Sequence, residues 1–255
     1  MKTFEKLSEE YNNINMIKRG GQKIVFSATK KEWGQCVIKL YFAQNDPRSL
    51  REIEIEKNID FPMIPKIFDT GIVEYETTET LYVVEEKIEG KELREVLDNG
   101  KIFSLKEAVS FLEQGLEFIA YIEKKGIVHR DIKPDNILIL NNRVYLTDFG
   151  LIFCDNDIDN LTDLNERIGP GKIAPPEFSN LGAFSYIDFK ASDVYLFAKV
   201  IWMILKEEPF GFYGPYKYGE DSKQLLLDEK KYSVETFIPI NKLIHEATYD
   251  DCIGY

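Results

Sequence analysis

The chain has 255 residues, and its 44 acidic residues outnumber its 32 lysines and arginines to give a net charge of −12 at pH 7. Such an acidic protein is a poor general binder of nucleic acid or of an anionic membrane surface, because both require a basic protein surface. Hydrophobic residues make up 44% of the chain and aromatic residues 13%, which excludes wholesale disorder. We therefore expect a globular protein of one large domain or two small lobes.

Two features bear on the compartment in which the protein works. The longest apolar run, residues 194–205, is interrupted by Lys199 and is too short to span a bilayer, and the N-terminus has no apolar signal region. The three cysteines, Cys36, Cys154 and Cys252, are far apart and form no CxxC pair. We interpret them as free thiols in a reducing compartment, so the expected localisation is cytoplasmic.

The first third of the chain is predicted to be rich in β-strands. Residues 23–29 and 35–41 are short runs of β-branched and aromatic residues, and the turn candidate KKEWG separates them. Residues 47–58 then have a helical pattern, and residues 81–85 predict a further strand. A change of composition at residues 89–90 marks a candidate hinge.

The later part of the chain is predicted to be mainly helical. Ser104 and Glu107 have the spacing of a capping box, which predicts that a helix begins there, and Gly126 is well placed to end it. The buried face of this helix is predicted from the 3-4-3 spacing of Val109, Leu112, Leu116 and Ile119. Residues 193–205 predict a buried helix, so the pattern is α+β with a β-rich N-terminal lobe and a helical C-terminal lobe.

The most informative stretch reads HRDIKPDN and is followed by DFG. Within it, Asp131, Asn136 and Asp148 carry oxygen atoms suited to a hard cation such as Mg²⁺. Lys133 adds a positive charge beside them. Oxygen ligands, a spare carboxylate and a lysine suit phosphoryl transfer, in which positioning and charge neutralisation provide most of the catalysis.

A predicted hairpin brings the two halves of this stretch together. Strand-like runs flank Asn141-Asn142, a pair that tolerates left-handed turn geometry, so Asn136 and Asp148 should lie at the same open end. An ideal two-residue hairpin would place these two side chains on opposite faces. We therefore expect either a longer turn or irregular strand ends.

HRDIKPDN together with DFG resembles the catalytic and metal-binding core of the eukaryotic-type (Hanks-type) protein kinases. The resemblance covers nearly the whole chain. CVIK, ending at Lys39, is similar to the family's VAIK motif, and residues 81–90 resemble the hinge between its lobes. Residues 174–177 resemble the APE motif, and residues 192–195 resemble the start of the buried helix below the catalytic loop.

The resemblance implies one bilobal, protein-kinase-like domain over residues 1–255. The β-rich N-lobe would cover residues 1–86, the hinge residues 86–90 and the mainly helical C-lobe residues 91–255. The family's C-lobe has more helices than the sequence predicts after the run that ends at residue 205. We therefore expect a C-lobe that is short at its C-terminus.

The resemblance also implies roles in the transfer of the γ-phosphoryl group of ATP. Lys39 would hold the α- and β-phosphates, and Glu52 would pair with Lys39. Asp131 would accept the proton of the substrate hydroxyl, and Lys133 would neutralise the transferred phosphoryl group. The lysine two residues after Asp131 is typical of the serine/threonine branch, so the implied substrate is a protein hydroxyl.

The implied cofactors are ATP and Mg²⁺, with Asn136 and Asp148 as the metal ligands. The residues implied to bind the nucleotide are Gly20, Gly21, Val25, Lys39, Glu86 and Ile88. The glycine-rich loop departs from the family pattern, because two of its three glycine positions are lysines. Glu85 stands where the family commonly has an apolar gatekeeper residue.

Two alternative functions remain. A pseudokinase that binds nucleotide and acts as a scaffold is suggested by the altered glycine loop and by the absence of an arginine to pair with Glu177. A kinase-fold enzyme that phosphorylates a small molecule is suggested by Pro170, which stands where the family usually has a threonine-containing motif. The joint presence of Lys39, Asp131 and the metal ligands favours an active protein kinase.

Several of these residues also have plainer interpretations. Lys39 could be a solvated edge-strand lysine, and Glu54 and Glu56 lie close to Glu52 on the same predicted helix. His129 is interpreted as a packing and hydrogen-bonding residue below the catalytic loop.

The resemblance implies that Asp193 anchors the backbone of the catalytic loop. Arg130 could be a surface charge, or it could pair with a phosphorylated or acidic activation segment. Thr162 is the candidate for activating phosphorylation. An acidic residue between 155 and 166 could partly replace the phosphate, or this stretch could be a solvated acidic loop.

Overall fold

The computed structural model describes residues 2–20, 23–42, 47–148, 153–154, 171–178, 189–217, 226 and 233–249. The chain divides into two compact units, Met1–Glu89 and Gly90–Tyr255. The predicted architecture is confirmed, because the first unit is built on a sheet and the second mainly on helices. Each unit is described separately below.

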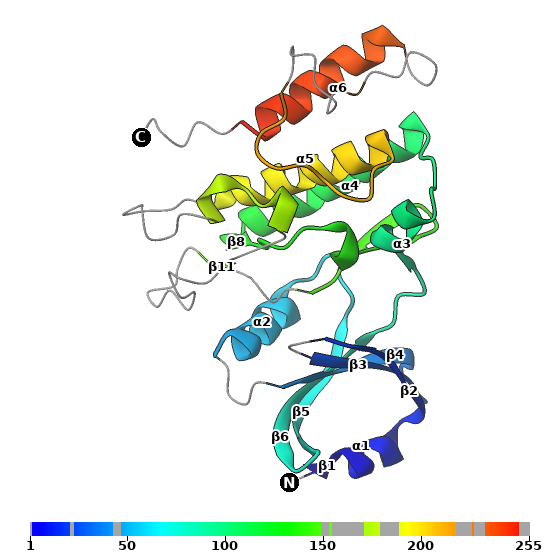
Figure 1. Ribbon diagram of the computed structural model, residues 1–255. Coiled ribbons are helices and arrows are strands. Elements are labelled where there is room, and N and C mark those ends of the chain that lie inside the picture. The colour runs from blue at the N-terminus through cyan, green and yellow to red at the C-terminus, as the bar shows by residue number, and fades with distance from the viewer. Residues whose placement is uncertain are drawn as a thin grey trace. The chain divides into compact units, whose positions relative to one another are not determined.

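One six-stranded sheet forms the first unit, in the order β1-β5-β6-β4-β3-β2 (Figure 1). Neighbouring strands are antiparallel, except that β1 runs parallel to β5. The strands are β1 (Lys2–Thr3), β2 (Asn12–Arg19), β3 (Lys23–Lys30), β4 (Gly34–Tyr41), β5 (Ile67–Tyr75) and β6 (Thr78–Glu86). The helices are α1 (Phe4–Glu10) and α2 (Pro47–Asn58).

Alternation along β4 sorts its side chains between the two faces of the sheet. Cys36, Ile38 and Leu40 belong to the main apolar core of the unit, together with residues of β3, β6 and α1. On the opposite face, Ile53 of α2 packs with Tyr41 of β4 and with residues of β6. Lys39 lies between Ile38 and Leu40 in the chain and therefore points to the face that α2 covers.

Two helices, α4 and α5, run side by side in the second unit (Figure 1). Its helices are α3 (Leu93–Asp98), α4 (Leu105–Glu123), α5 (Lys190–Lys206) and α6 (Val234–Ala247). Its strands are β7 (Lys91–Glu92), β8 (Ile127–Val128), β9 (Ile137–Leu140), β10 (Arg143–Leu146) and β11 (Phe153–Cys154). Three 3-10 turns are described: Pro134–Asn136, Gly171–Ile173 and Pro176–Phe178.

The predicted capping box of α4 is confirmed. The Glu107 N–H donates to the Ser104 hydroxyl at 3.2 Å, and the Ser104 N–H donates to the Glu107 carboxylate at 2.8 Å. Hydrogen bonds from Lys101 and Ser104 lower the pKa of Glu107 to about 2. After α4 ends, Gly126 adopts a φ of +69°, which a glycine reaches without steric cost.

The predicted buried face of α4 is wrong in part. Val109 and Leu116 are exposed, with 42% and 43% of their surface accessible, whereas Ile119 is buried as predicted. The residues of α4 that face the core are Ala108, Phe111, Gly115, Phe118, Ile119 and Ile122. A simple 3-4-3 count of aliphatic residues missed this face because a glycine and two phenylalanines contribute half of it.

Gly115 lets α4 and α5 approach closely. A Cβ atom at this position would lie 1.9 Å from the ring of Phe197 on α5, which is far inside van der Waals contact. The same Phe197 ring stacks on Phe111 at a centroid distance of 5.7 Å. The predicted buried helix at residues 193–205 is confirmed, since α5 is buried along nearly its whole length.

Lys199 is the unusual residue of α5, because its side chain is fully buried. Its ammonium group donates to the carbonyl oxygen of Phe212 at 3.1 Å and to that of Gly214. It also lies 3.4 Å from the centroid of the Phe212 ring. The lysine therefore fixes the loop that follows α5. No helix among the described residues is long and apolar enough to cross a membrane.

Candidate functional site

A buried carboxylate on α5 holds the backbone of the loop that contains HRDIKPDN. The N–H groups of His129 and Arg130 donate to the two carboxylate oxygens of Asp193 at 2.7 Å and 2.8 Å. Asp193 is 2% exposed, so these two hydrogen bonds form away from water. Burial raises the pKa of Asp193 to about 6. The predicted role of Asp193 as the anchor of this loop is confirmed.

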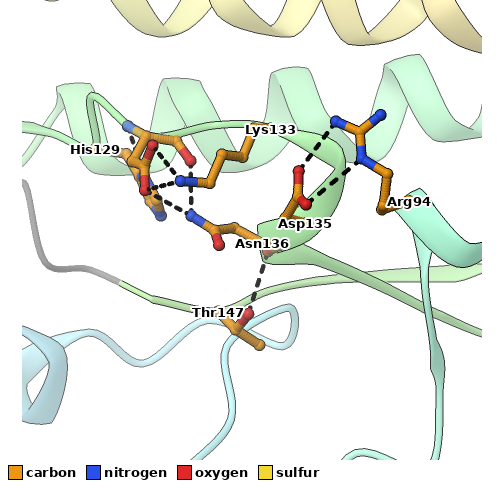
Figure 2. Close-up of polar contacts among 7 residues, drawn as sticks. Arg94, His129, Lys133, Asp135, Asn136 and Thr147 are labelled. Carbon is orange, nitrogen blue, oxygen red and sulfur yellow. Dashed lines mark hydrogen bonds and ion pairs between the residues drawn. The ribbon is translucent and has the colours of Figure 1, made fainter. Parts of the chain in front are cut away.

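Three polar residues converge at the centre of the loop (Figure 2). The ammonium group of Lys133 donates to both carboxylate oxygens of Asp131, at 2.9 Å and 2.7 Å. The amide nitrogen of Asn136 donates to Asp131 Oδ2 at 2.8 Å and to the Asp131 carbonyl oxygen at 3.0 Å. The Asp131 side chain is thus fixed in one orientation by two donors.

The electrostatics of Asp131 favour a proton acceptor. Burial raises the pKa of Asp131 above its ordinary value, while Lys133 and the Asn136 hydrogen bond oppose that shift. A carboxylate with a raised pKa is a better base than a solvated one. Lys133, which pairs with this carboxylate, is half-buried.

A second ion pair supports the turn that carries Asn136. Arg94 of α3 donates from Nη2 and Nε to the two oxygens of Asp135, at 3.1 Å and 3.5 Å (Figure 2). The Thr147 N–H donates to the Asn136 carbonyl oxygen at 2.9 Å, which ties the turn to the end of β10. Asn136 is therefore held through its neighbour Asp135 and through its own carbonyl oxygen.

The hairpin of β9 and β10 distinguishes between the two expectations for it, a longer turn or irregular strand ends. Asn141 and Asn142 both have positive φ values, 51° and 63°, so the turn has two residues. The expectation of irregular strand ends is confirmed, at the start of β9 and after the end of β10. Asn136 belongs to a 3-10 turn, and Asp148 has a φ of 67°.

The side chains of Asn136 and Asp148 suit a divalent cation. The amide nitrogen of Asn136 is directed to Asp131, so its amide oxygen points away from that carboxylate (Figure 2). Asp148 follows Thr147, whose N–H pairs with Asn136, so the two oxygen-bearing side chains lie on neighbouring segments. Among the described residues no cluster of three or more His, Cys, Asp or Glu side chains could hold a metal ion. One carboxylate and one amide nevertheless fit Mg²⁺, which keeps several water or phosphate ligands.

His129 is confirmed as a packing residue. It is fully buried, its Nδ1 accepts the Asp131 N–H at 3.3 Å, and its ring lies edge-on to Phe118. Burial lowers the pKa of His129 to about 4, so the ring is neutral at pH 7. The interpretation of Arg130 as a surface charge is wrong, because Arg130 is 4% exposed and lies over the ring of Phe189.

The first unit carries the predicted phosphate-binding lysine. Lys39 lies opposite Val25 of β3 and Val83 of β6 in the strand register, so these three side chains share one face of the sheet. The interpretation of Lys39 as a solvated edge-strand residue is wrong. Strand β4 lies between β3 and β6, and only 5% of Lys39 is exposed.

Glu85, which the sequence interpretation placed at the gatekeeper position, is an ion-pair partner of Lys39. Its carboxylate pairs with the Lys39 ammonium at 2.7 Å, and both side chains are buried. Glu52 was the predicted partner of Lys39, but its side chain lies outside the described residues. On the same helix, Glu56 is 3% exposed and Glu54 is exposed. Glu85 could have been noticed in the sequence as an acid that directly follows the apolar run LYVV.

The remaining nucleotide-binding candidates lie at the ends of strands. The Gly20 N–H donates to the Lys23 carbonyl oxygen at 2.9 Å, which begins the turn between β2 and β3, and Gly21 lies outside the described residues. The Glu86 N–H donates to the Lys66 carbonyl oxygen at 2.8 Å. Ile88 lies beyond the end of β6 and is half-buried.

Several predictions fall outside the described residues. They concern Phe149 and Gly150 of DFG, Thr162 with the acidic stretch 155–166, Pro170, and the side chain of Glu177. Nearby, the described turns at 171–173 and 176–178 place Ile173 and Phe178 in the core.

Comparison with known proteins matches this chain to protein kinases. The family model for the protein kinase domain matches residues 11–238. The probable serine/threonine-protein kinase PknB of Corynebacterium glutamicum is 32% identical over 181 residues, which cover 67% of this chain and 28% of that protein. Serine/threonine-protein kinase PrkC of Bacillus subtilis is 29% identical over 209 residues, which cover 79% of this chain and 31% of that protein.

A viral relative matches over a larger share of its own length. A putative serine/threonine-protein kinase of Acanthamoeba polyphaga mimivirus is 31% identical over 245 residues, covering 92% of this chain and 85% of that protein. By contrast, the matched region amounts to less than a third of the two bacterial relatives.

Proposed function

This chain belongs to the protein kinase family, and on that premise we propose that it transfers the γ-phosphoryl group of Mg-ATP to a serine or threonine hydroxyl of a protein. The observation that carries the proposal is the arrangement around Asp131. A buried carboxylate with a raised pKa is held by Lys133 and Asn136 in one orientation. A protein that only binds nucleotide has no chemical use for such a base.

Each residue of this cluster has a part in the proposed reaction. Asp131 orients the substrate hydroxyl and accepts its proton as the hydroxyl oxygen bonds to the γ-phosphorus and the bond from that phosphorus to ADP breaks. Lys133, already beside that carboxylate, neutralises charge on the transferred phosphoryl group. Asn136 and Asp148 would hold Mg²⁺, which supplies charge neutralisation at the phosphates when it is bound.

The first unit would bind the nucleotide. Lys39 would contact the α- and β-phosphates, and Gly20, Gly21 and Val25 would cover the nucleotide from the β2–β3 side. The Glu86 N–H is engaged within the sheet, so its carbonyl oxygen and the Ile88 backbone are the proposed contacts of the adenine ring.

Membership of this family also leads to proposals for the domain limits, the partner and the compartment of the protein. We propose a single catalytic domain over residues 1–255, with N-lobe 1–86, hinge 86–90 and C-lobe 91–255; the division of the chain at residues 89–90 supports this. The partner would be a protein substrate rather than nucleic acid, in keeping with the net charge of −12. Cys36 is a buried free thiol, which supports a reducing, cytoplasmic compartment.

A phosphoryl-transfer assay tests the proposal. The purified chain, γ-labelled ATP, Mg²⁺ and a general protein substrate should give labelled phosphoserine or phosphothreonine. Asp131→Asn should lower kcat by about 10²-fold or more, and Lys39→Ala should also abolish most transfer. Asp98→Asn and Lys31→Ala change exposed residues of the same types and serve as matched controls.

Three outcomes would contradict the proposal. Bound ATP without transfer would indicate a pseudokinase, and transfer only to small hydroxyl compounds would indicate a small-molecule kinase. Full transfer by Asp131→Asn would refute the assignment of the base.

A further inference from the structure

We propose that Glu85 is the main positioning residue of Lys39, so that a carboxylate carried by the sheet itself orients the lysine toward the nucleotide phosphates. This inference rests on the proposed function, because it names the residue that prepares the phosphate-binding site. Glu85 acts through Lys39 and does not touch the nucleotide in this proposal.

The contact is close and sheltered from water. The Lys39 ammonium and the Glu85 carboxylate lie 2.7 Å apart, and their side chains are 7% and 5% exposed. An exposed ion pair of this kind would be weak and mobile, because water and salt screen the charges. Burial removes that screening, so the attraction between the two charges is stronger than at the surface.

Strand register fixes the two residues relative to each other. Lys39 of β4 lies opposite Val83, and Val37 lies opposite Glu85 on the neighbouring strand β6. Lys39 and Glu85 are therefore diagonal neighbours on one face, a separation that long side chains bridge readily. The backbone ladder that sets this geometry continues over six residue pairs, from Cys36 to Tyr41.

Helix α2 is attached to the same face in a different way. Ile53 packs with Tyr41 and Val83 through apolar contact, which has no directional requirement. A shift of α2 would move any carboxylate that it carries, whereas β4 and β6 are joined by hydrogen bonds. Glu85 thus offers Lys39 a carboxylate whose position is set by the strand register.

The pairing is compatible with phosphate binding. An ammonium group has three N–H donors, so contact with one carboxylate oxygen does not prevent contact with phosphate oxygens. The carboxylate also confines a side chain that otherwise has four rotatable bonds and a large conformational entropy. Binding of the nucleotide then has less disorder to remove at Lys39, which raises affinity.

A double-mutant cycle on nucleotide binding tests the inference without requiring catalysis. The dissociation constant of Mg-ADP is measured by calorimetry for the wild type, Glu85→Gln, Lys39→Ala and the double variant. Glu85→Gln keeps the shape but removes the charge, and we expect it to weaken binding about tenfold. In the Lys39→Ala background the same change should have no further effect.

Two more variants define the comparison. Glu79→Gln changes an exposed glutamate of the same strand and should bind Mg-ADP like the wild type. Glu52→Gln on α2 should weaken binding less than Glu85→Gln does. If Glu85→Gln fails to fold, as judged by circular dichroism, Glu85→Asp replaces it, since a shorter carboxylate should retain part of the affinity.

The outcomes separate this inference from the proposed function. Wild-type affinity in Glu85→Gln, or an equal loss in the Lys39→Ala background, would overturn the positioning role. A larger loss from Glu52→Gln than from Glu85→Gln would overturn it as well, in favour of α2. Mg-ADP binding without phosphoryl transfer would contradict only the proposed function, whereas absence of Mg-ADP binding would refute both.

Discussion

The buried imidazole of His129 should make stability depend on pH in a way that one substitution removes. The perturbation is His129→Gln, which keeps a polar side chain of similar size but does not titrate. The Nδ1 atom of His129 accepts the Asp131 N–H at 3.3 Å, and a glutamine oxygen can accept the same hydrogen. The change therefore removes the ionisation with little loss of hydrogen bonding.

The magnitude follows from the difference between folded and unfolded chains. Burial lowers the pKa of His129 from 6.5 to about 4, so below pH 6.5 the unfolded chain binds a proton that the folded chain does not. The stabilising contribution is fully present above pH 6.5 and is lost as the pH falls toward 4. At about 1.36 kcal/mol per pH unit, the full loss is about 3 kcal/mol, of which about 2 kcal/mol falls above pH 5.

Urea unfolding at pH 7, 6 and 5 measures the effect. Trp202 on α5 is buried in the second unit, and the only other tryptophan of the chain is Trp33, so a Trp33→Phe background isolates its signal. The deficit in the free energy of unfolding of His129→Gln relative to its parent should shrink by about 2 kcal/mol from pH 7 to pH 5. Asp193, whose pKa is raised to about 6, gives a slope of opposite sign, but it is present in both proteins and cancels. A pH-independent deficit would refute the reasoning.

Three further predictions concern stability and are checked by thermal or urea unfolding. Ser104→Ala removes the N-cap of α4 and should lower the free energy of unfolding by about 1 kcal/mol, whereas Ser104→Asp should largely preserve it. Lys199→Met removes the donor to the loop carbonyls and should cost about 2 kcal/mol; an unchanged midpoint would show that these bonds contribute nothing. Gly115→Ala places a methyl group against Phe197 and should cost about 1–3 kcal/mol, and a combined Phe197→Leu change should restore part of it.

The strands of the first unit were predictable where their side chains alternate. Strand β3 has the period of two that follows from one buried face, whereas the second half of β4 is buried on both faces. The predicted limits of both strands agree with the observed ones within two residues. Strand β2 was not predicted because it lies at the edge of the sheet and is exposed along nearly its whole length. An edge strand without an apolar face leaves no periodic pattern to detect.

The candidate site was predictable where local sequence determines it. Asp131, Lys133 and Asn136 belong to one short loop, so their mutual contacts follow from the motif and its turn. The ion pair of Lys39 with Glu85 was not predicted, because it depends on the register of two strands whose sequences are far apart. The partner of a side chain on a neighbouring strand can be identified only when the register of the two strands is known.

The anchoring of the catalytic loop by Asp193 has a consequence for hydrogen exchange. The amides of His129 and Arg130 belong to a loop, where exchange with solvent deuterium is usually rapid. Because both donate to a carboxylate on the buried helix α5, they open to solvent only when that helix separates from the loop. Their protection factors should therefore match those of the α5 core, so that two loop amides report the most stable cooperative unit of the second half of the chain.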